Sequence, residues 1–354
     1  MCDFYEANKI LSMKTLAGET PDICFVTGNK SAGKTTDFEK LMFRWALRGR
    51  DPFGNNGKFN WLVRRQKAVK GAEMNWSDAL QRWYPEFKVT VRGFKNWSAA
   101  FVYANGVHVG QIVPFANTEF LKTSSLALSD CGYTIFDEFQ TETNSGYLPN
   151  EVGLFDAARV VFAKGGLANK AAVKKPCILL ANNVSKYNPY FVRYGVDKVI
   201  RDNTKFARGD IWVLEQTWNE QAARMVAENV GGMGKKQLEY ATGNRWLLDS
   251  DRFIGTPGGE KRCMVWFKFE GELYSVWVCE PGCLFVTNKL DGPKKTMLAV
   301  NDDDHESGTY LLPRTHPIYK TLKSNYELGR VMFQSEPCRR AFLLATGIIK
   351  ETVG

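Results

Sequence analysis

The feature that most constrains this chain is a glycine-rich loop, Gly28-Asn29-Lys30-Ser31-Ala32-Gly33-Lys34-Thr35. It fits the pattern G-x-x-x-x-G-K-[ST], in which backbone N–H groups surround the phosphates of a nucleotide. An apolar run at residues 23–27 precedes the loop, and residues 35–48, which contain neither glycine nor proline, follow it. A strand before the loop and a helix after it are the context that this motif requires. We therefore expect Lys34 to contact the β- and γ-phosphates and the Thr35 hydroxyl to bind Mg²⁺.

An acidic pair follows a second apolar run. Tyr133-Thr134-Ile135-Phe136 leads directly into Asp137 and Glu138. Asp137 has the position of the carboxylate that holds the Mg²⁺ shell in P-loop proteins. Glu138 has the position of the base that orients the attacking water in ATPase motors. The pair favours hydrolysis that drives motion over a kinase or a simple GTPase, so the cofactors we expect are ATP and Mg²⁺.

Two other strand ends contain asparagine, and each has more than one interpretation. Asn182 follows the apolar residues 177–181, where it could contact the γ-phosphate, but asparagine is also an ordinary turn residue. Asn288-Lys289-Leu290-Asp291 matches the N-K-x-D pattern with which GTPases read guanine. Because it lies far beyond the P-loop and across the expected domain boundary, we interpret it as a turn after a strand.

Strand-like and helical segments alternate up to about residue 215. This alternation predicts an α/β fold with a mostly parallel sheet covered by helices on both faces. Residues 216–256 are rich in helical patterns, and a strand meander begins after Pro257-Gly258-Gly259. We therefore expect a P-loop ATPase domain at 1–215, a helical linker at 216–256 and a smaller α+β domain at 257–354.

The net charge of +9, from 47 basic and 38 acidic residues, is concentrated in the first part of the chain. Residues 255–354 carry 13 Lys/Arg and 12 Asp/Glu, which leaves 34 and 26, a net of +8, for residues 1–254. Residues 58–70 hold five basic side chains and no acid, and residues 164–208 hold ten against two aspartates. Such stretches suit a nucleic-acid backbone that is contacted without sequence reading, although solubility alone would also explain the net charge. The candidate DNA-binding residues are Arg64, Arg65, Lys67 and Lys70.

The composition argues against several other classes of protein. Hydrophobic residues make up 44% of the chain and charged residues 24%, as in ordinary globular proteins. No run of about 18 apolar residues could span a membrane, and the first residues do not have the pattern of a secretory signal. The scattered cysteines in apolar runs indicate buried thiols in a reducing cytoplasm. Cys263, Cys279 and Cys283 with His305 or His316 lack the C-x₂-C spacing that is typical of zinc sites.

Several motifs together, in chain order, resemble the DNA-encapsidation ATPases of small tailed phages, the Picovirinae-type viruses whose linear genomes carry a terminal protein. Besides the P-loop and the acidic pair, these motifs are Trp61-Leu62-Val63-Arg64-Arg65, Tyr147-Leu148-Pro149-Asn150-Glu151-Val152, residues 182–191, Asp251-Arg252-Phe253-Ile254-Gly255 and Ser275-Val276-Trp277-Val278. The resemblance covers nearly the whole chain. It implies an ASCE-type ATPase that forms a pentameric ring on the portal of the prohead and pumps double-stranded DNA inward.

The resemblance also implies partners and roles for single residues. In some members of the family the portal carries a packaging RNA, and the protein acts in the cytoplasm of the infected host cell, transiently on the prohead. The P-loop and the acidic pair take the roles given above. Lys67 would face DNA in the channel, with Arg64 and Arg65 near the crevice at the strand ends. Lys122 would reach the nucleotide of the neighbouring subunit.

The chain departs from the family pattern at the arginine that completes a neighbour's ATP site. The family places this arginine directly after a Val-Phe pair, whereas Val161-Phe162 is followed here by Ala163-Lys164. Lysine lacks the planar fork with which arginine binds phosphate oxygens. Arg159, Lys164 and Lys122 are all candidates for this trans-acting cation.

The resemblance implies an RNase H-like fold for the C-terminal domain. Two-metal hydrolysis in a nuclease needs carboxylates that hold two ions about 4 Å apart. The first expected strand, residues 263–269, contains no acid, and the candidate acids lie in turns (Glu270, Glu272) and at Asp302-Asp303-Asp304. We therefore expect this domain to have lost its cutting activity.

Two further functions are kept as alternatives. Another enzyme of the same kind would be a ring helicase or a P-loop nucleic-acid translocase of the host. A protein of another class would be a nucleotide-gated structural adaptor on the portal, with little turnover. Glu138 argues against the adaptor, because a protein that only binds nucleotide needs no catalytic base.

Overall fold

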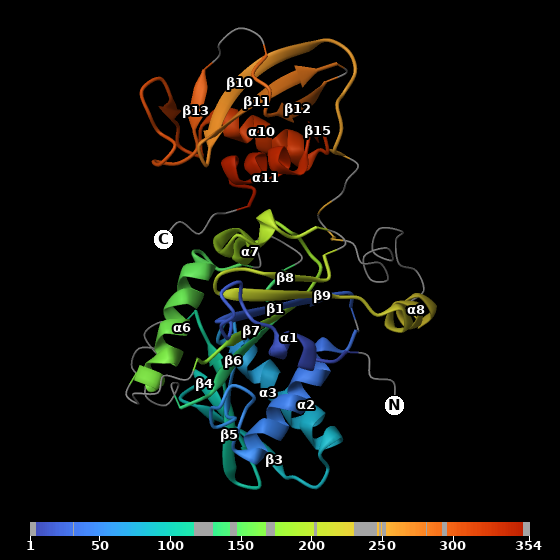
Figure 1. Cartoon of the computed structure of the whole chain (residues 1–354), viewed down its shortest axis with the longest axis vertical. Coiled ribbons are helices and arrows are strands. Elements are labelled where there is room, and N and C mark those ends of the chain that lie inside the picture. The colour runs from blue at the N-terminus through green and yellow to red at the C-terminus, as the bar shows by residue number, and fades with distance from the viewer. Residues whose placement is uncertain are drawn as a thin grey trace. The chain divides into compact units, whose positions relative to one another are not determined.

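The chain forms two compact units, Met1–Asp249 with Thr352–Gly354, and Ser250–Glu351, which we call the N-terminal and the C-terminal unit (Figure 1). The computed structural model describes residues 5–30, 32–116, 130–141, 147–167, 174–201, 204–229, 246, 247, 249, 253–280, 282–291 and 296–349. Within these ranges, the side chains at 75, 79, 164–167, 226, 227 and 229 are not described.

The helices and strands of the N-terminal unit are α1 (Asn8–Ser12), β1 (Ile23–Gly28), α2 (Lys34–Arg48), β2 (Phe59–Val63), α3 (Lys67–Trp83), β3 (Val89–Phe94), β4 (Ala99–Ala104), β5 (Val107–Pro114), β6 (Tyr133–Asp137), α6 (Glu151–Leu167), β7 (Cys177–Asn182), α7 (Pro189–Tyr194), the short 3-10 helix η2 (Val196–Lys198), β8 (Phe206–Arg208), β9 (Trp212–Thr217) and α8 (Glu220–Asn229). Those of the C-terminal unit are β10 (Lys261–Phe269), β11 (Glu272–Cys279), β12 (Cys283–Thr287), β13 (Met297–Ala299), β14 (Tyr310–Leu311), α10 (Pro317–Glu327), β15 (Val331–Phe333) and α11 (Glu336–Ala345).

A nine-stranded sheet runs through the described part of the N-terminal unit, in the order β3-β4-β5-β2-β6-β7-β1-β9-β8. The strands from β5 to β9 in this order pair in parallel. Antiparallel pairs add β4 and β3 at one edge and β8 at the other. The tight turn expected between β4 and β5 is present, since Asn105 and Gly106 adopt φ angles of 48° and 83°. The predicted α/β fold with a mostly parallel sheet is confirmed.

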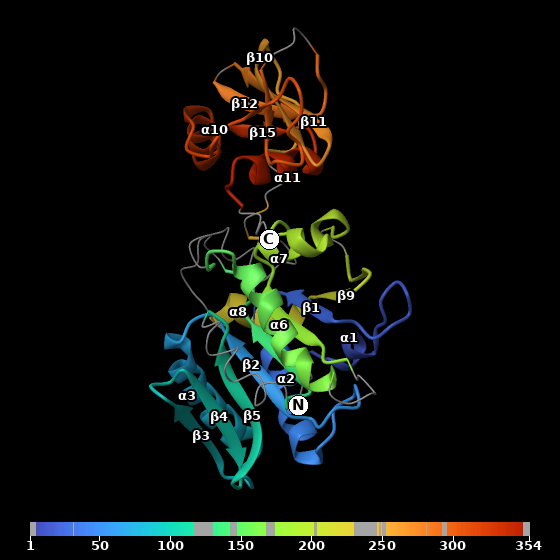
Figure 2. The ribbon, with the colours of Figure 1, turned by 90° about the vertical axis from the view of Figure 1, so that its left-hand side faces the viewer.

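Helices cover both faces of this sheet (Figures 1 and 2). Along β1, Ile23 and Phe25 belong to a hydrophobic core that includes side chains of α6 and α7. Cys24 and Val26 belong to a second core, on the other face, that includes side chains of α1, α2 and α3. Because both faces are covered, the central strands are apolar at every position rather than at every second one.

The carboxyl ends of the central strands lie at one edge of the sheet. Strand β7 lies between β1, which leads into the P-loop, and β6, which leads into the acidic pair. Ligands of open parallel sheets bind at the carboxyl ends of the strands. The fold therefore brings the expected catalytic residues to the edge where a ligand would bind.

The C-terminal unit contains a six-stranded sheet among its described residues, in the order β14-β13-β10-β11-β12-β15. Strands β10, β11 and β12 form an antiparallel meander. Strand β13 pairs in parallel with β10, and β14 in parallel with β13. Numbered along the chain, these five strands have the order 3-2-1-4-5, which is that of the RNase H-like fold. An additional strand, β15, pairs in parallel with β12.

The division into units differs from the expected division into three parts. Residue 215 lies inside β9, whose last residue, Thr217, pairs with Gly28 of β1. Helix α8 lies in the segment that was expected to be a separate linker, and this segment up to Asp249 belongs to the N-terminal unit. Within the described ranges, no helix combines the length and the apolar character that a membrane crossing needs.

Candidate nucleotide site

The P-loop is held in shape by contacts with the segment around β9. A Cβ atom on Gly28 would lie 2.3 Å from the carbonyl oxygen of Thr217, so only glycine fits at this position. The Asn29 side chain donates to the carbonyl oxygen of Asn219 at 3.1 Å and accepts from the N–H of Asn219 at 3.0 Å. Gly33, with φ 91°, lies in the left-handed region directly before α2. Because no described side chain caps this end of α2, its first N–H groups can bind a phosphate.

Lys34 is buried at the start of α2. Its Nζ donates to the carbonyl oxygen of Asn29 at 2.9 Å and to Oδ1 of Asn182 at 3.4 Å. Burial lowers the pKa of Lys34 to about 8, although the charge of Asp137 opposes this shift. The two oxygens that bind the ammonium are neutral, and a phosphate oxygen would bind it more strongly. Asn182 thus lies beside Lys34, where the sequence alone also allowed an ordinary turn residue.

Thr35 and Asp137 meet across the site. The Thr35 hydroxyl donates to Oδ2 of Asp137 at 3.0 Å. Two oxygens that occupy neighbouring positions around Mg²⁺ lie about 2.9 Å apart, because each is 2.0–2.1 Å from the ion in octahedral geometry. Burial raises the pKa of Asp137 to about 6; the Thr35 hydrogen bond opposes this shift, and the charge of Glu138 adds to it. A cation between these oxygens would remove the cost of the buried negative charge, so the residues present fit Mg²⁺.

Glu138 follows Asp137 in an uncommon backbone conformation. Its φ angle is 57°, in the left-handed region that residues other than glycine rarely adopt. Its N–H donates to Oδ1 of Asp137 at 3.0 Å, so the turn is fixed by the carboxylate beside it. The Glu138 side chain is exposed at the sheet edge. Strain of this kind is characteristic of active sites, where the surrounding structure holds a residue in a fixed direction.

Arg64 fixes the same turn from the neighbouring strand. Its Nε donates to both carboxylate oxygens of Glu151, at 3.0 and 3.1 Å. Its terminal nitrogens donate to the carbonyl oxygens of Glu138 and Phe139, both at 2.6 Å. The Arg64 side chain is 15% exposed and that of Glu151 only 1%. In this structure the Arg64 guanidinium is bound to Glu151 and to the turn at Glu138 and Phe139, and these contacts argue against the expectation that it contacts DNA.

The other three candidate DNA-binding residues are exposed. Arg65, Lys67 and Lys70 lie where β2 leads into α3, and their side chains face solvent. The residue between the first two, Gln66, donates from its amide to the carbonyl oxygen of Asn96 at 2.8 Å. Strand β2 is next to β6 in the sheet, so this basic segment starts one strand away from the acidic pair.

The structure describes only one of the three candidates for the trans-acting cation in full. Arg159 on α6 is paired within its own chain: its guanidinium is 3.2 Å from a carboxylate oxygen of Asp156 and 3.6 Å from one of Asp22. Its side chain is 20% exposed, and it also bonds to the Tyr194 hydroxyl at 3.5 Å. These contacts argue against Arg159 in this role. Lys122 lies outside the described residues, as does Ser31 of the P-loop, and for Lys164 only the backbone is described.

Two buried carboxylates near the site were missed in the sequence. Glu39 lies one turn after the P-loop threonine on α2, and burial together with the charge of Asp137 raises its pKa to about 7. Glu151 accepts from Arg64 and from the Tyr190 hydroxyl, the latter at 2.9 Å. Both lie in regular helices, where an acidic residue usually belongs to a face in contact with solvent. The one available signal for Glu39 was its position one helical turn after Thr35.

Two acids of the C-terminal unit, Asp304 and Glu270, have structural partners. The buried Asp304 carboxylate accepts from the N–H groups of Glu270 and Gly271, at 3.0 and 2.8 Å, and so supports the turn between β10 and β11. Glu270 in turn forms two hydrogen bonds of 2.8 Å with Arg340. The described residues contain no group of three or more His, Cys, Asp or Glu side chains that could hold a metal ion.

The fold and the sequence are both similar to those of phage packaging proteins. The DNA packaging protein of Bacillus phage B103 is 26% identical over 325 residues, which cover 89% of this chain and 93% of that protein. That of Bacillus phage phi29 is 24% identical over 334 residues, which cover 93% and 90%. A chain in the bacteriophage Phi-29 viral genome packaging motor assembly matches 96% of this chain and 97% of its own length, with TM-score 0.62 and 20% identity. One in the Phi-28 gp11 DNA packaging motor matches 98% and 99%, with TM-score 0.57 and 15% identity. At these identities the solved structures show that the fold is shared.

A model of one protein family matches almost the whole chain. It describes the podovirus DNA encapsidation protein (Gp16), and the match extends over residues 2–346. The match includes the P-loop, the acidic pair and nearly all of the C-terminal unit. This chain therefore belongs to the podovirus DNA encapsidation protein family.

Proposed function

We propose that this chain is an ATPase that drives double-stranded DNA into a preformed viral capsid. The observation that carries the proposal is the 3.0 Å contact between Thr35 and Asp137, which joins the P-loop to the acidic pair. This contact lies one strand away from the exposed basic start of α3. The names of the relatives, DNA packaging protein, support the choice of DNA packaging among the possible uses of such a site.

The chain's own residues would hold ATP and Mg²⁺ as follows. Lys34 and the first N–H groups of α2 bind the phosphates, and Asn182 contacts the γ-phosphate beside Lys34. Thr35 and Asp137 hold the ion. Bound Mg²⁺ would neutralise charge on the phosphates and so assist hydrolysis. The side chain of Glu138 orients the attacking water and accepts its proton.

The basic segment would bind DNA without reading its sequence. Arg65, Lys67 and Lys70 point into solvent and can reach a phosphate backbone. Arg64 contacts the carbonyl oxygen of Glu138, and it directly follows β2, at the start of this basic segment. A change in the direction of α3 would therefore shift the turn that contains Glu138. Arg64 would in this way couple ATP hydrolysis to the movement of DNA.

The assembly expected for such a motor follows from the same relatives. We infer that the chain forms a ring, with five subunits as the family resemblance implies, on the portal of the prohead. A packaging RNA on the portal is a further proposed partner. One similar chain comes from a viral genome packaging motor assembly, which supports assembly of this chain with other components. The place of action would be the host cytoplasm, transiently on the prohead.

One experiment separates this function from the two alternatives. The purified chain is mixed with proheads, ATP and linear double-stranded DNA, and protection of the DNA from added nuclease is measured together with phosphate release. We expect protected DNA that requires both ATP and proheads. Strand separation without protection would identify a helicase. The absence of steady-state phosphate release, with proheads still bound, would identify a structural adaptor.

A further inference from the structure

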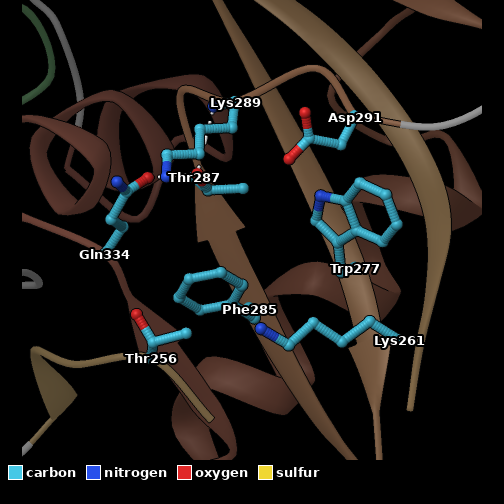
Figure 3. A pocket seen from close by; sticks show the side chains of 8 residues that line it. All are labelled: Thr256, Lys261, Trp277, Phe285, Thr287, Lys289, Asp291 and Gln334. Atoms are coloured by element: carbon cyan, nitrogen blue, oxygen red, sulfur yellow. Dashed lines mark hydrogen bonds between the residues drawn. The ribbon is translucent and has the colours of Figure 1, made fainter. Parts of the chain in front are cut away.

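The C-terminal unit contains a pocket of about 320 Å³ beside the strands β10, β11 and β12 (Figure 3). Trp277 of β11 and Phe285 of β12 supply its aromatic wall, and they are direct neighbours across the two strands. The pocket has about the lower limit of size for a small-molecule site. Its polar lining comes from two lysines, one carboxylate, one glutamine and two threonines. Nothing in the proposed motor chemistry uses these residues.

The aromatic wall is fixed to the loop after β12. The indole N–H of Trp277 donates to the Ser275 hydroxyl at 2.8 Å, and that hydroxyl donates to the carbonyl oxygen of Lys289 at 2.6 Å. Ser275 is fully buried. The ring of Trp277 and the backbone of the loop are thus held together by a buried hydroxyl. A ligand would find the wall preformed, and little ordering would be needed on binding.

The hydrogen-bonding groups of the pocket divide into donors and one strong acceptor. The Thr287 hydroxyl donates to the side-chain oxygen of Gln334 and accepts from the N–H of Lys289. Because the oxygen of Gln334 is occupied, its NH₂ group is the part left for a ligand. Lys261, whose Nζ lies 4.9 Å from the centre of the Phe285 ring, and Lys289 add two ammonium groups.

Asp291 supplies the acceptor. It is the carboxylate in the lining, and it forms no hydrogen bond or ion pair with another residue that the structure describes. Figure 3 shows Asp291 on the same side of the pocket as Trp277, with Gln334 on the opposite side. A flat ligand that stacks on Trp277 would therefore meet a carboxylate along one edge and donors along another.

Among the nucleic-acid bases, guanine matches this arrangement. It carries two adjacent N–H donor groups, at N1 and N2, which one carboxylate can accept together. Its opposite edge carries the O6 and N7 acceptors, which lysine and amide donors bind. Adenine and cytosine place an acceptor where guanine has its N1–H, and that acceptor would face the carboxylate unpaired. Stacking on aromatic side chains favours every base and does not distinguish them.

We propose that the pocket of the C-terminal unit binds a guanine base that carries a phosphate, with Asp291 reading the base and Trp277 stacking on it. Lys289 and Gln334 bind O6 and N7, and Lys261 binds the phosphate. The residues Asn288-Lys289-Leu290-Asp291 then do more than form the turn that we inferred from the sequence. The guanine comes either from a free nucleotide or from an unpaired position in a nucleic acid.

The test uses the full chain and the mononucleotides GMP and AMP, measured by calorimetry. The Lys34→Ala background keeps the P-loop from contributing. We expect GMP to bind about 5- to 150-fold more tightly than AMP, because a good bidentate contact discriminates against the wrong base by this amount. Asp291→Asn should remove the preference and instead favour xanthosine monophosphate, whose C2 oxygen accepts from the new amide. Asp303→Asn, an exposed carboxylate outside the pocket, is the matched control and should change nothing.

The source of the base is decided by a second pair of probes. A short adenosine oligoribonucleotide with one central guanosine is compared with the same oligonucleotide without it. If the guanosine strengthens binding beyond that of GMP, and Asp291→Asn removes the gain, the ligand is a base in a nucleic acid. If GMP binds as tightly as the oligonucleotide, it is a free nucleotide. Equal binding of GMP and AMP, or a preference that survives Asp291→Asn, would overturn the proposal.

Discussion

Replacing Arg64 with lysine separates the role that the structure gives this residue from the role that its sequence context suggested. Lysine keeps the positive charge, but its single nitrogen cannot reach Glu151 and the carbonyl oxygens of Glu138 and Phe139 together. The lysine ammonium would pair with the buried Glu151, because a buried carboxylate without a cation would lower the stability most. The two 2.6 Å bonds to the carbonyl oxygens would then be lost.

The expected losses follow from these contacts. Hydrogen bonds to charged groups contribute about 1.5–3 kcal/mol each, and water would replace part of this, so the free energy of unfolding should fall by about 2–4 kcal/mol. Glu138, with its φ of 57°, would no longer be fixed by Arg64. A displacement of about 1 Å at a catalytic group costs about 10²-fold in rate. Steady-state phosphate release at saturating ATP should therefore fall by about that factor, and urea unfolding measures the loss of stability.

A second variant is needed to test whether Arg64 contacts DNA, because the lysine of Arg64→Lys could still bind a DNA phosphate. Arg64→Gln combined with Glu151→Gln removes both charges and leaves two amides that can pair with each other. We expect the salt dependence of DNA binding to be unchanged in this double variant. Arg65→Ala, its exposed neighbour, should lower the slope by about one unit. If the double variant lowers the slope as much as Arg65→Ala while Arg64→Lys hydrolyses ATP at the parental rate, Arg64 contacts DNA and our reasoning is wrong.

Three further outcomes are expected. Glu138→Gln should bind ATP and Mg²⁺ but hydrolyse ATP about 10²–10⁴-fold more slowly, because the base is lost; a parental rate of phosphate release would contradict its role. Lys67→Ala with Lys70→Ala should weaken binding equally on all DNA sequences and reduce the salt slope by up to about two units, so a sequence-dependent loss would place them off the DNA path. Burial raises the pKa of Asp137 to about 6, so the folded chain holds this proton more tightly than the unfolded chain does. The stability that this provides is present at low pH and lost as the pH rises through 6; unfolding between about pH 4 and 7 should show a loss of up to about 3 kcal/mol that Asp137→Asn removes.

The sheet and the contact between the P-loop and the acidic pair could be predicted because short-range signals determine them. Glycine is the residue that fits at position 28, and the helix that follows needs no distant partner to start, so the P-loop is visible in the sequence. The acidic pair follows a strand that is apolar at every position, which places it inside a parallel sheet. The carboxyl ends of parallel strands then share one edge. The contact between Thr35 and Asp137 follows from these facts.

The contacts of Asn182 and Asp304 could not be predicted from such short-range signals. A strand-end asparagine and a loop aspartate have the same sequence context whether they serve a ligand or a turn. The difference lies in what approaches them from distant parts of the chain. Lys34 comes within 3.4 Å of Asn182, while Asp304 is occupied by two backbone N–H groups of a hairpin more than thirty positions earlier. Such pairings depend on strand order, which local pattern does not specify.

Arg64 and Arg65 make the same point at neighbouring positions. They are the same residue type in the same basic segment, and charge alone assigns them one function. Directly after a strand, successive side chains still point in opposite directions, so one of the two turns toward the sheet edge and the other toward solvent. Arg64 there meets a buried carboxylate and two carbonyl oxygens, and its planar fork can bind all of them at once. Glu151 is what decides between the two, because a buried carboxylate requires a cation and only the inward arginine can reach it. The turn at Glu138 is thus held by a residue whose contacts depend on a helix that begins far along the chain.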